Sequence, residues 1–319
     1  MKSLFIIGNG FDYYAHKMKT KYMDFREYLV RKYPECDTDF DGLLYSSMQP
    51  DGGEEYDMDE VVGSIIRTID ECSAPEWNDL EECLGKSFIS NIAYDNEWAF
   101  KETDIEDDED DEIFHSIYEN EDLSNAIIGA YAILHRLFVE WVYEELANID
   151  YSDYRKLIRT PSIKNAGFLN FNYTETLEKM YGILPEQVCH IHGSVYGREE
   201  DIYFGHGDDE EFNGFIQYWG IDEAFNSLKK QLRKNTNNAL CDNIDFFKSL
   251  ADVKKIYSYG FSFSDVDMIY VEEIKKNIKS KRVKWYFNKY DWDNNKEYIK
   301  KIKALGFKVR VTRKWKQAK

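Results

Sequence analysis

The chain has 319 residues, of which 43% are hydrophobic and 16% aromatic, enough for one large domain or two ordinary ones. Its formal net charge of −19 repels nucleic acid and anionic membranes on average, and no run of about 18 apolar residues offers a membrane span. The five cysteines include no C-x-x-C pair, which favours a reducing, cytoplasmic location over a disulfide framework or a cysteine-based zinc site.

The first predicted element is a buried strand over residues 2–7, which ends at Gly8-Asn9-Gly10. Glycines let backbone amides approach an anion, and the first such turn of a doubly wound sheet holds a dinucleotide pyrophosphate. A purely structural turn explains the glycines equally well, because Tyr13 replaces the third glycine of G-x-G-x-x-G. Asp12 would repel a phosphate, so we expect it to cap a helix or to face a ribose or a histidine.

The next segments are predicted to be mostly helical. Residues 22–32 and, further on, 57–94 and 121–158 carry apolar side chains at helical spacing. Between the last two lies an acidic block, 95–122, with 14 Asp and Glu against Lys101, a net charge of −13. A solvated surface segment is the plain interpretation of this block, and a mobile lid or partner-docking strip is the alternative.

Beyond residue 160, short apolar runs alternate with polar helical segments. The predicted strands are 167–171, 188–192, 202–205, 255–260, 283–288 and 307–311. This alternation predicts an α/β fold with a doubly wound, mainly parallel sheet of the Rossmann type. Residues 1–34 and 160–319 would form this domain, and residues 35–159 a mostly helical insertion.

The last part of the chain is basic. Residues 275–319 hold 17 Lys and Arg against three acidic residues, a net charge of +14. These cations could be the solvated face of helices, a surface for nucleic acid or an acidic partner, or the counterpart of the acidic block within the molecule or across a homo-oligomer.

Polar side chains follow several of the predicted strands. Asn170, Asn172 and Thr174 come at the end of the strand 167–171, and ligands of α/β enzymes bind at the carboxyl ends of strands. Turn formation by the asparagines and capping of the next helix by Thr174 are the structural alternatives.

Three of the six histidines fall in one short window, at positions 190, 192 and 206. Strand alternation would place His190 and His192 on one face, with Gly193 allowing close approach. No carboxylate or cysteine has a companion spacing, so we expect no metal here, and a histidine acting as general base is the better hypothesis.

A fourth cluster follows the strand 255–260. Gly260, Ser262, Ser264, Asp265 and Asp267 form a turn before a helix. Such hydroxyls and carboxylates can bond phosphate or ribose, and capping of the helix by Ser264 or Asp265 is the alternative.

The stretches IIGNGFD, Tyr22-x-Asp24-Phe25, FNYTETLE, HIHG and GFSFSD, in this order, resemble the abortive-infection protein AbiH family. More distantly, the order is similar to the sirtuin-like NAD-binding fold. The resemblance implies that Gly8, Asn9 and Gly10 lie at the phosphates, Asn172 beside the nicotinamide ribose and His192 at the base position. Gly260 and Ser262 would then lie along the dinucleotide.

The chain departs from sirtuins in three respects. It lacks the cysteine–zinc module, Thr174 replaces the aspartate after the asparagine, and His206 stands where sirtuins have a glutamate. Protein deacetylation is therefore not expected. Defence-associated sirtuin-like proteins are mostly NAD-consuming effectors, and the AbiH name implies phage defence.

Three functions follow as hypotheses. The first is hydrolysis of the nicotinamide–ribose bond of NAD, with Asn172 holding water or ribose and His192 accepting the proton. The second is a non-catalytic sensor of NAD or an ADP-ribose-like nucleotide. The third is a metal-dependent nucleic-acid processing enzyme. The expected partners are a dinucleotide and a second copy or an accessory defence protein, with no membrane.

Overall fold

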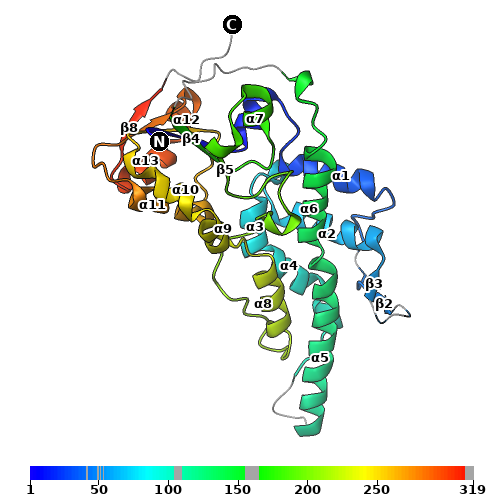
Figure 1. Cartoon of the computed structure of the whole chain (residues 1–319). Coiled ribbons are helices and arrows are strands. Elements are labelled where there is room, and N and C mark those ends of the chain that lie inside the picture. Colours follow the sequence, from blue (N-terminus) through cyan, green and yellow to red (C-terminus); the bar gives the residue numbers. More distant parts are fainter. Residues whose placement is uncertain are drawn as a thin grey trace. The chain divides into compact units, whose positions relative to one another are not determined.

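The computed structural model describes residues 1–40, 42–48, 50, 52, 54–103, 110–154 and 165–312 (Figure 1). The chain divides into two compact units. The sheet unit comprises Met1–Lys21, Val139–Tyr203 and Asn235–Lys319, and the helical unit comprises Tyr22–Phe138 and Phe204–Lys234. The predicted bounds were 1–34 with 160–319 and 35–159. In the structure, residues 22–34 and 204–234 belong to the helical unit and residues 139–159 to the sheet unit.

Aromatic packing explains why the first helix belongs with the helical unit. Helix α1, Tyr22–Lys32, has the predicted bounds, and its buried Phe25 packs edge-on against Trp77 and Phe138. Phe138 also stacks on Phe204, which begins the second segment of this unit.

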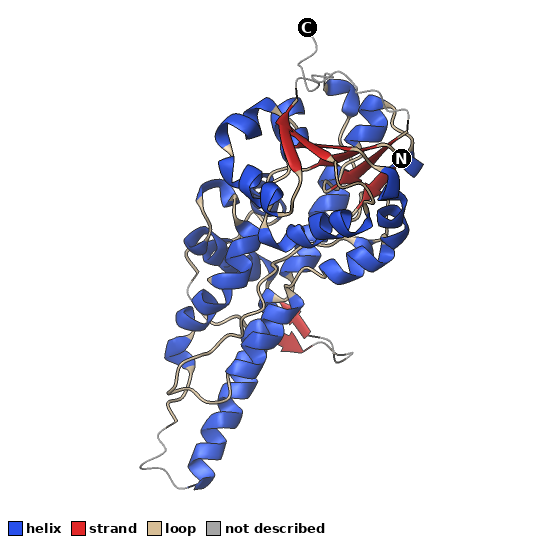
Figure 2. Ribbon diagram, turned by 90° about the vertical axis from the view of Figure 1, so that its left-hand side faces the viewer, coloured by secondary structure: helices blue, strands red, loops and turns tan. Residues whose placement is uncertain are grey.

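The sheet unit is built on six parallel strands in the order β5–β4–β1–β6–β7–β8, drawn in red in Figure 2. Their bounds are β1 Ser3–Ile7, β4 Ala166–Asn170, β5 Val188–His190, β6 Lys255–Tyr259, β7 Lys284–Phe287 and β8 Lys308–Val311. Counted along the chain, this order is 3-2-1-4-5-6, that of the doubly wound dinucleotide-binding fold. The predicted α/β fold class is therefore confirmed.

Strand β1 lies at the centre of the sheet, and Leu4, Phe5, Ile6 and Ile7 are all buried, as expected for a strand covered on both faces. One face carries Leu4 and Ile6 and packs against four helices, α9, α10, α11 and α13. The other carries Phe5 and Ile7 and packs against α7 and a π-helical turn, Phe11–His16. The helices of this unit are α7 Thr176–Tyr181, α9 Thr236–Asp242, α10 Ile244–Lys248, α11 Met268–Asn277, α12 Lys289–Asn294 and α13 Lys296–Ala304.

The helical unit contains a small antiparallel hairpin of β2, Ser46–Met48, and β3, Glu54–Tyr56. Its helices, besides α1, are α2 Met58–Cys72, α3 Leu80–Lys86, α4 Phe88–Asp95, α5 Asp110–Tyr131, α6 Leu134–Trp141, which crosses the unit boundary, and α8 Asp222–Gln231.

Helix α5 begins inside the acidic block, about eleven residues before the predicted helix. The buried Asn120 explains this extension, because it bonds the backbone of Lys101 and the Trp219 carbonyl. Gly220 also packs closely on the Ile117 carbonyl. The part of the block at 104–109 lies outside the described residues.

Two sequence-based expectations are wrong. Residues 202–205 form no strand, because after Tyr203 donates to the His192 carbonyl the segment runs as a loop to Gly205, whose φ is +132°. Cys72 and Cys83 form a disulfide, although no such bond was expected. The positions of the two cysteines in the sequence did not indicate this bond, because it depends on how the end of α2 packs against α3.

By length and mean hydropathy alone, the stretch Ile113–Leu146 could cross a membrane. Many of its apolar side chains, including Ile127, Leu134 and Leu137, are however buried inside the protein. This burial is typical of a helix that packs in a protein core.

Candidate functional site

The loops that follow β1, β4, β5 and β6 meet at one edge of the sheet, here called the carboxyl rim. Because the chain goes from β1 towards β5 and later from β6 towards β8, the order of the sheet reverses between β1 and β6. In open α/β sheets this switch point is where ligands bind. Most of the predicted site residues lie on these four loops.

The glycines of the first loop pack against the loop that follows β6. A Cβ on Gly8 would lie 2.4 Å from the Gly260 carbonyl oxygen, and one on Gly10 would lie 2.7 Å from the Gly260 Cα. The Gly8 amide donates to the Tyr259 carbonyl and the Gly10 amide to that of Gly260, each at 3.1 Å. The glycines therefore bring two loops into backbone contact, and these two amides are already engaged.

Asn9 and Gly193 also hold loops in place. The Asn9 side chain donates to the Thr20 carbonyl at 2.8 Å and accepts from the Thr20 hydroxyl at 2.6 Å. Gly193 has a φ of +85°, and a Cβ there would lie 2.3 Å from the Asp201 carbonyl oxygen. Both positions therefore fix the shape of the rim.

Asp12 is completely buried in the π-helical turn after β1. The Thr174 hydroxyl donates to its Oδ2, and its Oδ1 has no hydrogen-bond partner among the described residues. Burial raises the pKa of Asp12 to about 6, although Thr174, Thr176 and Asn172 lower it in part. Asp12 thus caps no helix, and Thr174 holds this carboxyl group instead of capping α7.

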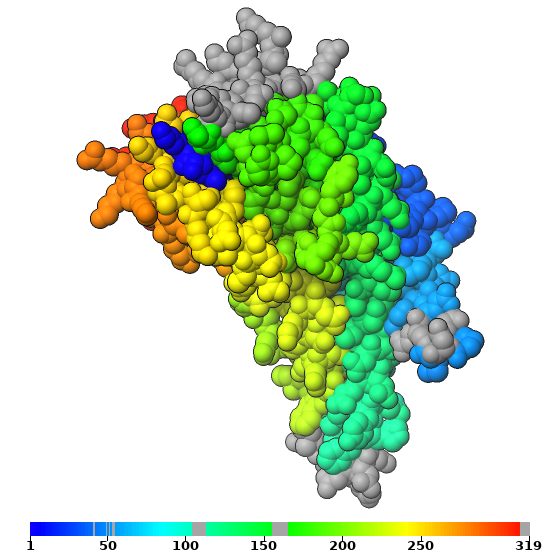
Figure 3. All heavy atoms as spheres, viewed as in Figure 1, coloured from blue at the N-terminus to red at the C-terminus, as the bar shows by residue number. Residues whose placement is uncertain are grey.

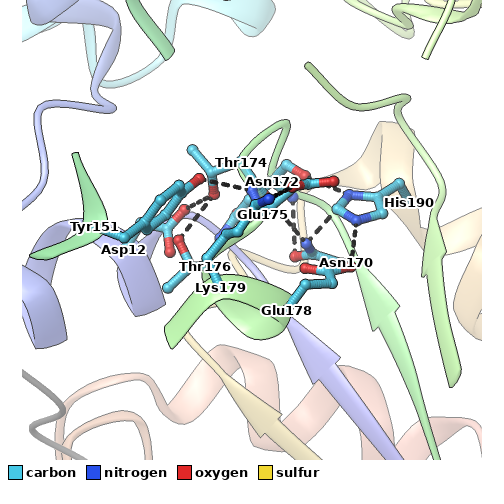
Figure 4. Close-up of polar contacts among 10 residues, drawn as sticks. All are labelled: Asp12, Tyr151, Asn170, Asn172, Thr174, Glu175, Thr176, Glu178, Lys179 and His190. Carbon is cyan, nitrogen blue, oxygen red and sulfur yellow. Dashed lines mark hydrogen bonds and ion pairs between the residues drawn. The ribbon is translucent and has the colours of Figure 1, made fainter. Parts of the chain in front are cut away.

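Asn170, Asn172, His190 and Glu178 form a connected polar cluster beside Asp12 (Figure 4). Asn170 Oδ1 accepts from the Asn172 amide at 3.2 Å, and His190 Nε2 lies 2.9 Å from Glu178 Oε1. His190 Nδ1 lies 3.3 Å from Asn170 Nδ2 and 3.2 Å from the Asn172 carbonyl oxygen. His190 Nδ1 accepts a hydrogen bond from Asn170 Nδ2 when it carries no proton, and it donates to the Asn172 carbonyl when it carries one.

His192 belongs to a separate cluster. Its Nε2 lies 3.2 Å from Asp267 Oδ1, and the Ser264 hydroxyl donates to Asp267 Oδ2 at 3.0 Å. The His192 ring is 5% exposed and packs edge-on against Phe171. The prediction that His190 and His192 share a strand face is wrong, because β5 ends at His190 and the chain turns there.

The structure does not bring all of the predicted residues together. Among the described residues, no hydrogen bond joins Asn172 to His192. Ser262 is exposed, and Asp265 is 95% exposed and forms an ion pair with Lys301 at 2.6 Å instead of capping a helix. Ser264 also makes no side-chain cap, since it donates to Asp267.

His206 lies in the helical unit. Its Nε2 bonds the Lys229 carbonyl at 2.8 Å, and its Nδ1 accepts from the Asp208 amide at 3.1 Å. A pocket of about 380 Å³ in that unit is lined by Lys86, Asp208 and Lys229, among others, and by none of the predicted site residues. Within the described residues, no group of three His, Cys, Asp or Glu side chains is placed to hold a metal ion.

Sequence reasoning missed Glu178 and Thr176 as site residues. Glu178 pairs with His190, and Thr176 lies beside Thr174 with its hydroxyl 3.1 Å away. Both belong to the stretch FNYTETLE, so the motif contained them, but only the fold shows that the first turn of α7 faces Asp12 and His190.

The rim therefore offers two kinds of chemistry. Asp12 Oδ1, Asn172 Oδ1 and Glu178 Oε2 are buried acceptors that lack a hydrogen-bond donor in the part of the chain that is described. Such atoms are costly to leave unpaired, so they suit a ligand with hydroxyl or amide donors. His192 Nε2 lies 3.2 Å from Asp267 Oδ1 but makes no hydrogen bond within the described residues, so this buried histidine can exchange a proton with a ligand.

A search of curated proteins finds no match to this sequence. The family model described as bacteriophage abortive infection AbiH matches residues 4–289, which include the helical unit, most of the sheet unit and all the residues of the rim. The chain belongs to the AbiH family of bacteriophage abortive-infection proteins.

Proposed function

We propose that this AbiH protein acts in abortive infection by binding NAD at the carboxyl rim and hydrolysing its nicotinamide–ribose bond. The observation that carries the proposal is the strand order, with its switch point between β1 and β6, where doubly wound folds bind dinucleotides. The resemblance to sirtuin-like NAD-binding proteins supports it. The protein would act in the cytoplasm, where NAD is available.

The buried side chains of the rim fit the demands of this reaction. Water attacks the ribose C1′ while the bond to nicotinamide breaks, and the ring leaves as a neutral molecule with the bonding electron pair. The site must then orient water and ribose and accept one proton. Asn172 would orient the water or a ribose hydroxyl through its unpartnered Oδ1. His192, whose Nε2 lies 3.2 Å from Asp267 Oδ1, would accept the proton directly or through a ribose hydroxyl.

A second candidate is a nucleotide sensor without catalysis. Two observations favour it. The Gly8 and Gly10 amides are engaged with the loop after β6, and His192 has no hydrogen bond to Asn172 among the described residues. A rim that only binds a nucleotide and shifts its loops does not need a general base aligned with an attacking water molecule.

The test is nicotinamide release by the purified full chain with NAD, measured by chromatography, together with NAD binding by calorimetry. His192→Ala and Asn172→Ala are compared with His206→Ala, a buried histidine of the helical unit. Loss of a general base lowers the rate roughly 10²–10⁴-fold, so His192→Ala should lose that much while His206→Ala retains activity.

His192→Gln serves as a second variant in case the alanine substitution disturbs folding, which thermal melts would show. Saturable binding without product would favour the sensor. A wild-type protein that neither binds NAD nor releases nicotinamide would contradict both candidates.

A further inference from the structure

The opposite edge of the sheet, where the strands begin, carries a dense group of cations. Eight exposed basic residues lie on the strand starts and the loops that precede them, and we call them the amino-edge cluster: Lys2, Lys254, Lys255, Lys279, Lys281, Arg282, Lys284 and Lys308. Asp252 is the one acidic residue within the segments that carry these cations, 1–2, 251–255, 278–284 and 305–308, and Glu186 precedes β5 at the same edge.

Backbone hydrogen bonds show that these segments are neighbours. The Lys254 amide donates to the Lys2 carbonyl and the Lys284 amide to that of Lys254, at 3.0 and 3.2 Å. The Lys279 amide donates to the Ala251 carbonyl, and the Lys308 amide donates to the Val283 carbonyl. In Figure 3 the blue start of the chain accordingly lies against yellow and green segments on one exposed surface.

Three of the lysines form a row across the sheet. Lys255 pairs in register with Lys284, and Lys284 with Lys308, so they stand side by side on β6, β7 and β8. Neighbouring strands are about 4.8 Å apart. Residues in register on parallel strands point to the same face, so the sheet holds three positive charges in a line about 10 Å long.

The amino-edge cluster lacks carboxylate partners. None of its eight members forms an ion pair with a described Asp or Glu. Other exposed lysines of the same unit do, at 3.2 Å for Lys276 with Glu273, 2.7 Å for Lys289 with Asp293 and 2.6 Å for Lys300 with Glu297. Like charges directly opposite on neighbouring strands repel, so the free protein leaves this edge electrostatically unsatisfied.

We propose that the amino-edge cluster binds the phosphate backbone of nucleic acid. A fixed line of exposed cations fits a polyanion whose charges repeat along a chain, and lysines act as point charges without base specificity. The average charge of −19 does not oppose this, because screening limits exposed charges to about 8–10 Å. The sheet unit by itself has 30 Lys and Arg against 22 Asp and Glu, a net charge of +8.

This site is independent of the proposed NAD site, because it lies at the other end of the same strands. Binding would be insensitive to base sequence and sensitive to salt. A protein that neutralises about four phosphates of duplex DNA loses roughly 10²-fold in affinity between 50 and 200 mM salt.

The experiment measures fluorescence anisotropy of labelled 20-nucleotide DNA, single-stranded and duplex, with the full chain over this salt range. The test variant is Lys255→Gln/Lys284→Gln/Lys308→Gln. The matched control is Lys276→Gln/Lys289→Gln/Lys300→Gln, which removes the same charge from lysines paired with carboxylates. The test variant should weaken binding at least tenfold at 50 mM salt and flatten the duplex salt slope by about 2.7, since each phosphate contact contributes about 0.9.

The control should bind within about twofold of the wild type, and thermal melts of the test variant should be unchanged or slightly higher because repulsion is relieved. Equal losses in both triple variants, or no wild-type binding at 50 mM salt, would overturn the proposal. Binding to phosphatidylserine vesicles or self-association through these lysines, without DNA binding, would also overturn it.

Discussion

The sheet unit has a net charge of +8, whereas the helical unit has 11 Lys and Arg against 38 Asp and Glu, a net charge of −27. The two units also differ in how they bury polar groups. In the helical unit, buried side chains such as Asn120 and His206 have partners. The atoms without a hydrogen-bond partner that are described there, Asp59 Oδ1, Arg67 Nε and Glu119 Oε2, belong to side chains that are only partly buried. In the sheet unit, Asp12, Asn172 and His192 are buried with one unpartnered atom each.

This difference shows where a ligand is expected. Folding alone accounts for a buried polar group that is paired, but an unpaired one calls for an explanation beyond stability. The acidic surface of the helical unit favours solubility and does not by itself indicate a site. The sheet unit combines unpaired buried acceptors at one edge with unpaired exposed cations at the other, so both proposed sites lie in it.

The largest effect should come from Gly8→Ala in the sheet unit. Its Cβ would meet backbone atoms of Gly260 at 2.4 Å, which cannot move without shifting β6. We expect a loss of about 3 kcal/mol in unfolding free energy, as for an overpacked core, and a Tm lower by roughly 6–12 °C without any ligand.

Gly182→Ala is the control for this variant, because Gly182 has nothing within 4 Å of its Cβ position, although its own φ is +64°. It should cost about 1 kcal/mol. If Gly8→Ala weakened NAD binding but left the Tm of the free protein unchanged, the glycine would serve the ligand and not the packing of the two loops.

The next effect concerns the helical unit. The Cys72–Cys83 disulfide closes a loop with a sequence separation of 11 residues. Its reduction should cost about 2–3 kcal/mol through the entropy gained by the unfolded chain. Melts of the oxidised protein with and without reductant measure this. The variant Cys72→Ser/Cys83→Ser should be insensitive to reductant, and a reductant effect that persists in it would refute the assignment.

An effect of opposite sign is expected for Asp12→Asn. Since the pKa of Asp12 is about 6 in the folded protein against an ordinary 3.8, the folded state binds this proton more tightly than the unfolded chain does. Stability therefore falls as the pH rises from about 4 to 6 and stays lower above that range.

Asparagine carries no charge at this position, so Asp12→Asn should be about 3 kcal/mol more stable than wild type at pH 7 and no more stable at pH 4. Denaturant titrations at the two pH values check this. A variant that is less stable at pH 7 would show that the buried carboxylate is held by partners stronger than Thr174.

Much of the fold could be predicted from the sequence, because its signals are local. The apolar runs at 2–7, 167–171 and 255–260 became β1, β4 and β6, and the alternation of strands and helices predicted the parallel sheet. The run 202–205 was wrongly predicted as a strand. Ile202 and Phe204 are buried by the packing of a loop, and this produces the same alternation of buried and less buried side chains as a strand. The Cys72–Cys83 pair could not be predicted, since it depends on how α2 and α3 pack.

The site was predicted in part. The loops at Gly8, Asn172, His192 and Gly260 do meet at one rim, as the positions of strand ends implied. The partners of their side chains could not be predicted, because pairs such as Asp12 with Thr174 and His192 with Asp267 are 162 and 75 positions apart in sequence. His206 falls in the other unit, since a turn directs the chain after Tyr203 into the helical segment.

The most direct test of the central claim is hydrogen–deuterium exchange of the full chain with and without saturating NAD. The account predicts slower exchange in peptides that cover residues 8–16, 168–176, 188–193 and 260–267, which form the carboxyl rim. Exchange should be unchanged in the amino-edge loops 251–255 and 278–284. Protection confined to the helical unit, or no protection at any NAD concentration, would contradict the claim that the rim is the nucleotide site.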